Sequence, residues 1–184
     1  MRAAPEVNER LTAASGAALL LLLAAEGVTI LFIRPLLSTH VFIGMLLIPP
    51  VALKLGSTGW RFARYYRGAR EYVDRGPPLL PLRLLAPVVV VSTLVVFGTG
   101  VALLVRGPGP GLLLGLHKAS FVVWLAATGV HVLAYVWRVP RLARVARGPW
   151  ILVAGAIIAG TILAFMTVRF AHPWLHWAAH DDGG

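Results

Sequence analysis

Three histidines of this chain fall inside long apolar runs, where an ionisable side chain is costly. They are His40, His117 and His131. A side chain of this kind inside a membrane span is usually kept for a function, such as holding a cofactor or moving a proton. The sequence contains no cysteine, which excludes disulfides, thiolate metal sites, iron–sulfur clusters and covalently attached haem. Histidine is therefore the residue type that could hold a redox cofactor here.

Five apolar runs form the elements that must position these histidines. The chain is 58% hydrophobic and 13% charged, whereas a soluble domain carries about 25% charged residues. About 20 helical residues, at ~1.5 Å per residue, cross a hydrocarbon core of ~30 Å, and each run is long enough to do so. We therefore predict an all-α integral membrane bundle with five transmembrane helices. The predicted spans are residues 11–33, 36–55, 84–105, 112–137 and 150–170.

The basic residues predict how the bundle is oriented. All but four of the 17 Lys and Arg residues precede the first span, lie between Lys54 at the end of the second span and the start of the third, or lie between the fourth and fifth spans. Positively charged connections stay in the cytoplasm, so the N-terminus is predicted inside and the C-terminus outside. Residues 56–83 then form a cytoplasmic basic amphipathic connection, and residues 171–184 form an extracytoplasmic tail. Residues 1–184 are thus a single multi-pass bundle in the plasma membrane, surrounded by lipid.

With this orientation, His40 and His117 lie at nearly equal depth close to the outer face. A b-type haem requires two such imidazoles on different helices, because each gives one nitrogen to the iron from opposite faces of the ring. We therefore predict one haem b with His40 and His117 as axial ligands. Arg34, Arg106 and Lys118, near the outer boundary, are expected to pair with the haem propionates. In the alternative interpretation, each histidine only bonds to a neighbouring helix.

Glu26 is the single acidic residue inside a predicted span. Two roles follow from its chemistry: it could accept a proton from a quinol, or accept a hydrogen bond from the distal nitrogen of a haem-ligating imidazole. A protonated carboxyl group bonded to a neighbouring helix is the structural alternative.

The tail carries three more histidines at four-residue intervals. They are His172, His176 and His180. Imidazoles at positions i and i+4 of a helix can share a zinc or copper ion, so the tail is a weak candidate for a surface metal site. Pro173 and the alternating tryptophans favour an ordinary interfacial segment instead. His172 is also a reserve haem ligand.

The fourth span carries a histidine pair that resembles a known pattern. His117 and His131 are 14 residues apart, within the stretches 116–121 and 130–133. This pair resembles the spaced ligands of the bacterial cytochrome b561 and ferric-reductase-like membrane cytochromes. In two-haem relatives a second helix carries its own pair, whereas Lys54 stands 14 residues after His40 here. The resemblance therefore leaves three roles open for His131: an inner haem, a quinone site, or an interfacial histidine.

The predicted function is that of a membrane cytochrome b subunit that carries electrons between the quinone pool and an extracytoplasmic partner. The resemblance implies an electron-transfer subunit of an oxidoreductase rather than a self-sufficient enzyme. The competing interpretation is a non-redox accessory or assembly subunit, whose histidines stabilise helix packing. Nucleic-acid binding is not expected despite the net charge of +10, because the arginines lie between apolar runs. The sequence does not give the oligomeric state.

Overall fold

The computed structural model describes residues 4–74, 76, 80–109, 111–135 and 148–180. Every regular element in these ranges is a helix, and the ranges contain no strand. The all-α prediction is therefore confirmed for the part of the chain that the structure describes. The arginine-rich segment after the fourth span and the end of the tail lie outside it.

Within the described residues, five helices are long and apolar enough to cross a membrane, as predicted. A helix satisfies all its backbone hydrogen bonds internally, which a segment in hydrocarbon requires. The five are α1 (Ala4–Leu31), α2 (Ile33–Tyr66), α4 (Leu80–Arg106), α5 (Leu112–Tyr135) and α7 (Gly148–Thr167).

Three of these helices extend beyond the predicted spans at the end of the bundle that was predicted to be cytoplasmic. α1 begins at Ala4 rather than at 11, α2 continues past 55 to Tyr66, and α4 begins at Leu80 rather than at 84. Hydropathy marks only the part of a helix that matches the hydrocarbon core, whereas helical hydrogen bonding can continue into the headgroup layer. The stretch 56–83 therefore begins as helix, and it also contains the short helix α3 (Arg70–Val73).

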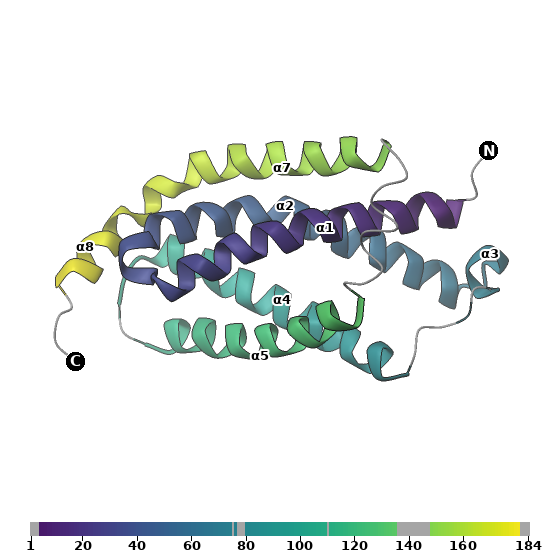
Figure 1. Ribbon diagram of the computed structural model, residues 1–184. Coiled ribbons are helices and arrows are strands. Elements are labelled where there is room, and N and C mark those ends of the chain that lie inside the picture. Colours follow the sequence, from purple (N-terminus) through teal and green to yellow (C-terminus); the bar gives the residue numbers. More distant parts are fainter. Residues whose placement is uncertain (1–3, 75, 77–79, 110, 136–147, 181–184) are drawn as a thin grey trace.

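The tail continues from α7 as helix and packs at the end of the bundle (Figure 1). α7 passes into a 3-10 turn, η2 (Val168–Ala171), and then into α8 (His172–His180). Pro173 occupies the first turn of α8, where its missing N–H removes no helical hydrogen bond. Trp174 is buried, and its Nε1 donates to the carbonyl oxygen of Leu103 on α4 at 3.1 Å. This bond ties the tail to the end of α4.

The helices form two groups, which we call the three-helix wall and the hairpin wall. In the three-helix wall, α2 packs against both α1 and α7, as the upper part of Figure 1 shows. In the hairpin wall, α4 and α5 pack against each other and run along the opposite side of the molecule. Few contacts join the walls, mainly between α2 and α4. The N- and C-termini lie at opposite ends of the bundle (Figure 1).

The closest backbone approach among the described glycines lies within the three-helix wall. A Cβ atom at Gly160 of α7 would lie only 2.1 Å from the carbonyl oxygen of Leu46 on α2. That carbonyl receives no helical hydrogen bond from Pro50, because proline has no N–H. Glycine is therefore required for α7 to pack directly on the exposed backbone of α2.

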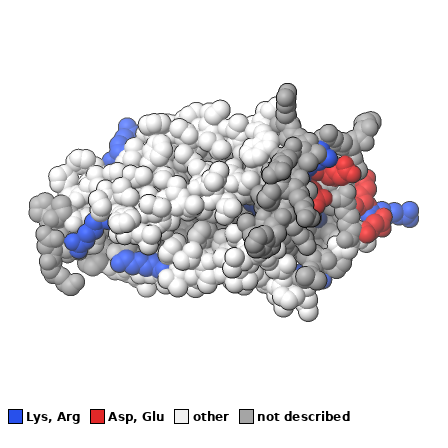
Figure 2. Space-filling view, in the orientation of Figure 1, with Lys and Arg blue, Asp and Glu red and all other residues white. Residues whose placement is uncertain are grey.

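Charged side chains are distributed unevenly along the surface. On the face shown in Figure 2, basic groups lie toward both ends, acidic groups lie at one end only, and an uncharged belt separates them. A belt of this kind is typical of a protein surrounded by lipid.

Candidate functional site: two histidines across an apolar cavity

A cavity of about 570 Å³ lies between the two walls. Residues of α1, α2, α4 and α5 line it, together with Trp174 of α8. This volume is within the range of about 300–1,000 Å³ that cofactor and ligand sites occupy. The lining is mostly apolar. The described lining residues with ionisable or hydroxyl groups are Glu26, His40, His117, Lys118 and Thr128.

His40 on α2 is held by two side chains of α1. Its Nδ1 lies 2.8 Å from Glu26 Oε1 and 3.1 Å from Thr29 Oγ1. The Thr29 hydroxyl lies 2.6 Å from the backbone oxygen of Glu26 and donates to it, so it can only accept from the imidazole. A carboxylate also only accepts. These partners therefore assign the ring hydrogen of His40 to Nδ1.

His117 on α5 is held in a similar way by α4. Its Nδ1 lies 3.1 Å from the carbonyl oxygen of Val96 and 3.0 Å from Thr99 Oγ1, and the Thr99 hydroxyl donates to Val95 of its own helix. A carbonyl oxygen accepts only, so Nδ1 of His117 carries the ring hydrogen as well. A Cβ atom at Gly100 would lie 3.2 Å from His117 Cε1, so the ring packs closely against α4 at a position that suits glycine.

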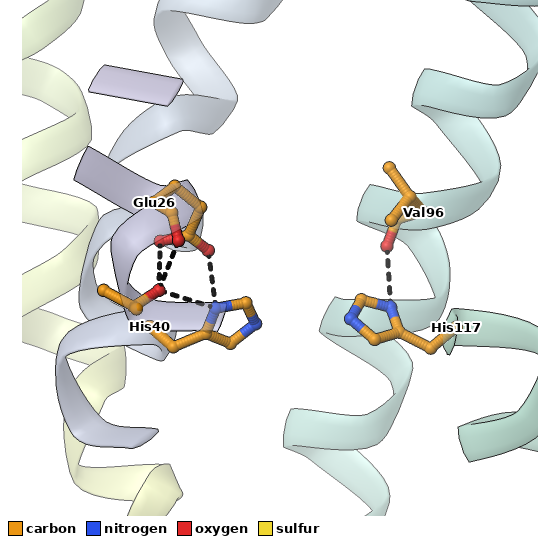
Figure 3. A network of polar contacts seen from close by, with 5 residues as sticks. Glu26, His40, Val96 and His117 are labelled. Carbon is orange, nitrogen blue, oxygen red and sulfur yellow. Dashed lines mark hydrogen bonds and ion pairs between the residues drawn. The ribbon is translucent and has the colours of Figure 1, made fainter. Parts of the chain in front are cut away.

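The two imidazole rings point toward each other across the cavity (Figure 3). In both rings the hydrogen-bonded Nδ1 faces its own wall, and the second nitrogen, Nε2, faces the gap. With the hydrogen on Nδ1, Nε2 keeps a lone pair that is available to a metal ion. Two imidazoles from opposite walls, with apolar side chains around them, are a donor set that would suit the two axial positions of haem iron.

The three basic residues expected near the outer boundary occupy different places. Lys118 lines the cavity next to His117. Arg34 lies near the start of α2 and Arg106 is the last residue of α4, and both side chains are exposed. Neither arginine is among the described residues that line the cavity.

His131 does not join this site. It lies on α5, one turn beyond Thr128, and is not one of the lining residues, although its neighbour Val132 is. Lys54, which stands where a spaced partner would be expected on α2, donates instead to the backbone oxygen of Thr12 on α1. The described residues therefore bring together one pair of histidines across the cavity.

The tail histidines lie on the surface. His172 and His176 are exposed, with ring centroids 4.7 Å apart on one side of α8. The side chain of His180 lies outside the described residues. Within the described part of the chain, no three histidine, aspartate or glutamate side chains are grouped so that they could hold a metal ion.

Four residues that contact the two histidines were not predicted as site residues: Thr29, Val96, Thr99 and Gly100. A signal was available for two of the contacts. Glu26 and His40 lie six and eight residues from the break between α1 and α2 at Phe32, and Gly100 and His117 lie six and five residues from the helix ends at Arg106 and Leu112. Residues at similar distances from the turn of a helical hairpin lie at similar heights.

Comparison with known proteins finds no matching family model, no matching curated protein and no matching solved structure. The function is therefore inferred from the geometry of the site.

Proposed function

We propose that this protein is a membrane-spanning cytochrome b subunit that binds haem b between His40 and His117. The observation that carries the proposal is the pair of opposed imidazoles, each with Nδ1 bonded to its own wall and Nε2 toward a shared cavity. Haem bound between them supplies reversible one-electron transfer. The function is to carry electrons between the quinone pool and a redox partner outside the cytoplasm.

The residues of the chain support this role in three ways. Glu26 and the backbone of Val96 hold the two rings in one tautomer, so that neither must reorient to bind iron. The apolar lining would keep water away from a bound cofactor. Lys118 is close enough to the cavity to pair with a propionate, and Arg34 and Arg106 remain candidates for the same role from its rim.

The orientation of the bundle is part of the proposal. The bias of Lys and Arg residues supports an N-terminus in the cytoplasm and a C-terminus outside the plasma membrane, which a reporter fused after Gly184 would test. The termini at opposite ends of the bundle are compatible with five crossings. The histidine pair then lies near the outer face, where an extracytoplasmic oxidoreductase could exchange electrons with the haem.

The spaced pair of His117 and His131 also supports a relation to the cytochrome b561 and ferric-reductase-like proteins. Those relatives suggest an electron-transfer subunit of a larger oxidoreductase. One haem per chain is the proposal, because Lys54 is engaged with α1 and no second histidine pair spans the cavity in the described residues.

An optical spectrum of the purified protein, oxidised and then reduced, tests the proposal. We expect one low-spin haem per chain, because both axial positions are filled, with little reaction toward carbon monoxide. His40→Ala and His117→Ala should each lose the haem or convert it to a form with one histidine ligand. His176→Ala is the matched control, since this exposed side chain lies on α8, and its spectrum should be unchanged.

Two results would contradict this function. Wild-type protein without haem, after expression with ample haem supply, would favour the non-redox accessory or assembly subunit. A spectrum that survives both His40→Ala and His117→Ala would place the ligands elsewhere and remove the basis of the proposal.

A further inference from the structure

A hydroxyl group without a hydrogen-bond partner lines the cavity away from the two histidines. Thr128 Oγ1 on α5 is shielded from water and makes no hydrogen bond to the described residues. Other threonines in these helices bond to their own backbone, as Thr93 Oγ1 does to Val89 at 2.6 Å and Thr161 Oγ1 to Ile157 at 2.9 Å. Buried hydroxyl groups are rarely left without a partner, so Thr128 indicates a ligand that accepts a hydrogen bond.

The surroundings of Thr128 define an inner compartment of the cavity. Thr128 follows His117 by 11 residues on the same helix, which is about 16 Å of helical rise. The side chains that line this part are apolar and come from both walls. They include Leu20, Leu23, Leu47, Ile48, Leu125 and Val132.

The inner compartment suits a neutral ligand. Glu26 and Lys118 are the charged side chains among the described lining residues, and both lie at the level of the histidine pair. A second haem would bring two propionates, and the described lining of the inner compartment offers them no cation. Gly129, the residue after Thr128, also lines the cavity, and a Cβ atom there would meet nothing within 4 Å, so there is space for a flat ring.

The compartment can be reached from the side. α1 and α5 both line it, yet among the described residues α5 packs substantially against α4 alone, and α1 packs against α2 and α7. The cavity is therefore bounded by two helices that hardly touch each other. In a bilayer this side faces the acyl chains, so an apolar ligand with a long tail can enter from the lipid.

We propose that the inner compartment binds the headgroup of a lipid-soluble quinone, with Thr128 Oγ1 donating a hydrogen bond to a quinone carbonyl. The isoprenoid tail lies between α1 and α5. This inference rests on the proposed function, in which the quinone pool exchanges electrons with the haem, and assigns a site to that substrate. A quinone matches the compartment because its ring is neutral, flat and apolar and its polar atoms are hydrogen-bond acceptors.

The test measures binding of decylubiquinone to detergent-purified protein by quenching of tryptophan fluorescence. Trp124, one turn before Thr128, lines the cavity and reports on it. Loss of one hydrogen bond should make binding about two- to tenfold weaker in Thr128→Val, while Thr128→Ser, which keeps the hydroxyl, should bind like wild type. Thr161→Val on α7 is the matched control and should leave the affinity unchanged. Gly129→Leu should abolish binding by filling the compartment.

Equal affinity of wild type and Thr128→Val, or a haem content of two per chain, would overturn the inference. The thermal unfolding temperature of each variant is compared with that of Thr161→Val, so that a misfolded variant is recognised. The binding measurement does not need haem. Quinone binding that depends on Thr128 in a protein without haem would support the site and contradict the cytochrome proposal, so the two failures are distinguishable.

Discussion

On the three-helix wall, His40 is held by the carboxyl group of Glu26, whereas on the hairpin wall His117 is held by the backbone carbonyl of Val96. A threonine assists on each side: Thr29 contacts the Nδ1 of His40, and Thr99 contacts that of His117. The rings have matching orientations (Figure 3), but only one of their main partners can carry a charge. On the three-helix wall, a point mutation of Glu26 can remove the charge next to His40. On the hairpin wall, no side-chain substitution removes the backbone carbonyl of Val96 that contacts His117.

The walls also differ in packing. α2 contacts α1 and α7 over long stretches, and Gly160 lets α7 approach the backbone of α2, whereas α5 packs substantially against α4 alone within the described residues. The three-helix wall is thus the scaffold of the bundle, and the hairpin wall is placed against it by fewer contacts. Substitutions that disturb helix packing should therefore mainly lower stability in the first wall and mainly displace the histidine ring in the second.

The largest expected effect is on the scaffold. In Gly160→Val the new Cβ would overlap the backbone oxygen of Leu46, which cannot move away by changing a rotamer. Overpacking usually costs about 1–3 kcal/mol, and a backbone clash belongs at the upper end of that range. We expect a clear loss of thermal stability in detergent. Gly155→Val, on an exposed face of the same helix with nothing within 4 Å of its Cβ, is the control. Equal stability of the two variants would contradict the close approach.

An intermediate effect is expected in the hairpin wall. In Gly100→Val, the Cβ would crowd His117 Cε1 at 3.2 Å and its methyl groups would push the ring off α4. A misplacement that costs about 1.4 kcal/mol would weaken haem binding about tenfold, with little change in the stability of the bundle. Gly98→Val, an exposed position on the same helix, should bind haem normally. Haem content per chain is the measurement, and identical content in both variants would argue against the contact.

The five apolar helices were predictable because hydrophobic length alone sets them. The inner ends were not, since Ala4, Tyr66 and Leu80 lie where helical hydrogen bonding continues outside the hydrocarbon. The division of the helices into two walls and the cavity between them could not be predicted from the sequence pattern either. They depend on close approaches such as that of Gly160 to Leu46, which no periodicity reveals.

At the site, the pairing of His40 with His117 was predicted from equal depth, and the structure places the two rings opposite each other. One of the two roles predicted for Glu26 was a hydrogen bond with a haem-ligating imidazole; the structure shows a contact between Glu26 and His40 Nδ1, and the ligation itself stays a prediction. Val96 could not be predicted, because its backbone carbonyl is the contact and any side chain offers one. The role of Thr128 could not be predicted either, because only the structure shows that its hydroxyl group lacks the usual hydrogen bond to the backbone of its own helix.

A shift of the haem potential, with no change in stability or haem content, separates the two walls most directly. Glu26→Gln keeps a hydrogen-bond acceptor near His40 and removes the negative charge, which favours the more positive, oxidised iron. Its loss should raise the midpoint potential by on the order of 60 mV, or about 1.4 kcal/mol for one electron. Thr99→Val should shift it by less than about 20 mV, because the Val96 carbonyl still accepts from His117. Redox titration followed by the optical spectrum measures both shifts. A lowered potential in Glu26→Gln, or equal shifts in Glu26→Gln and Thr99→Val, would contradict the prediction that the Glu26 charge makes the His40 side electrostatically different from the His117 side.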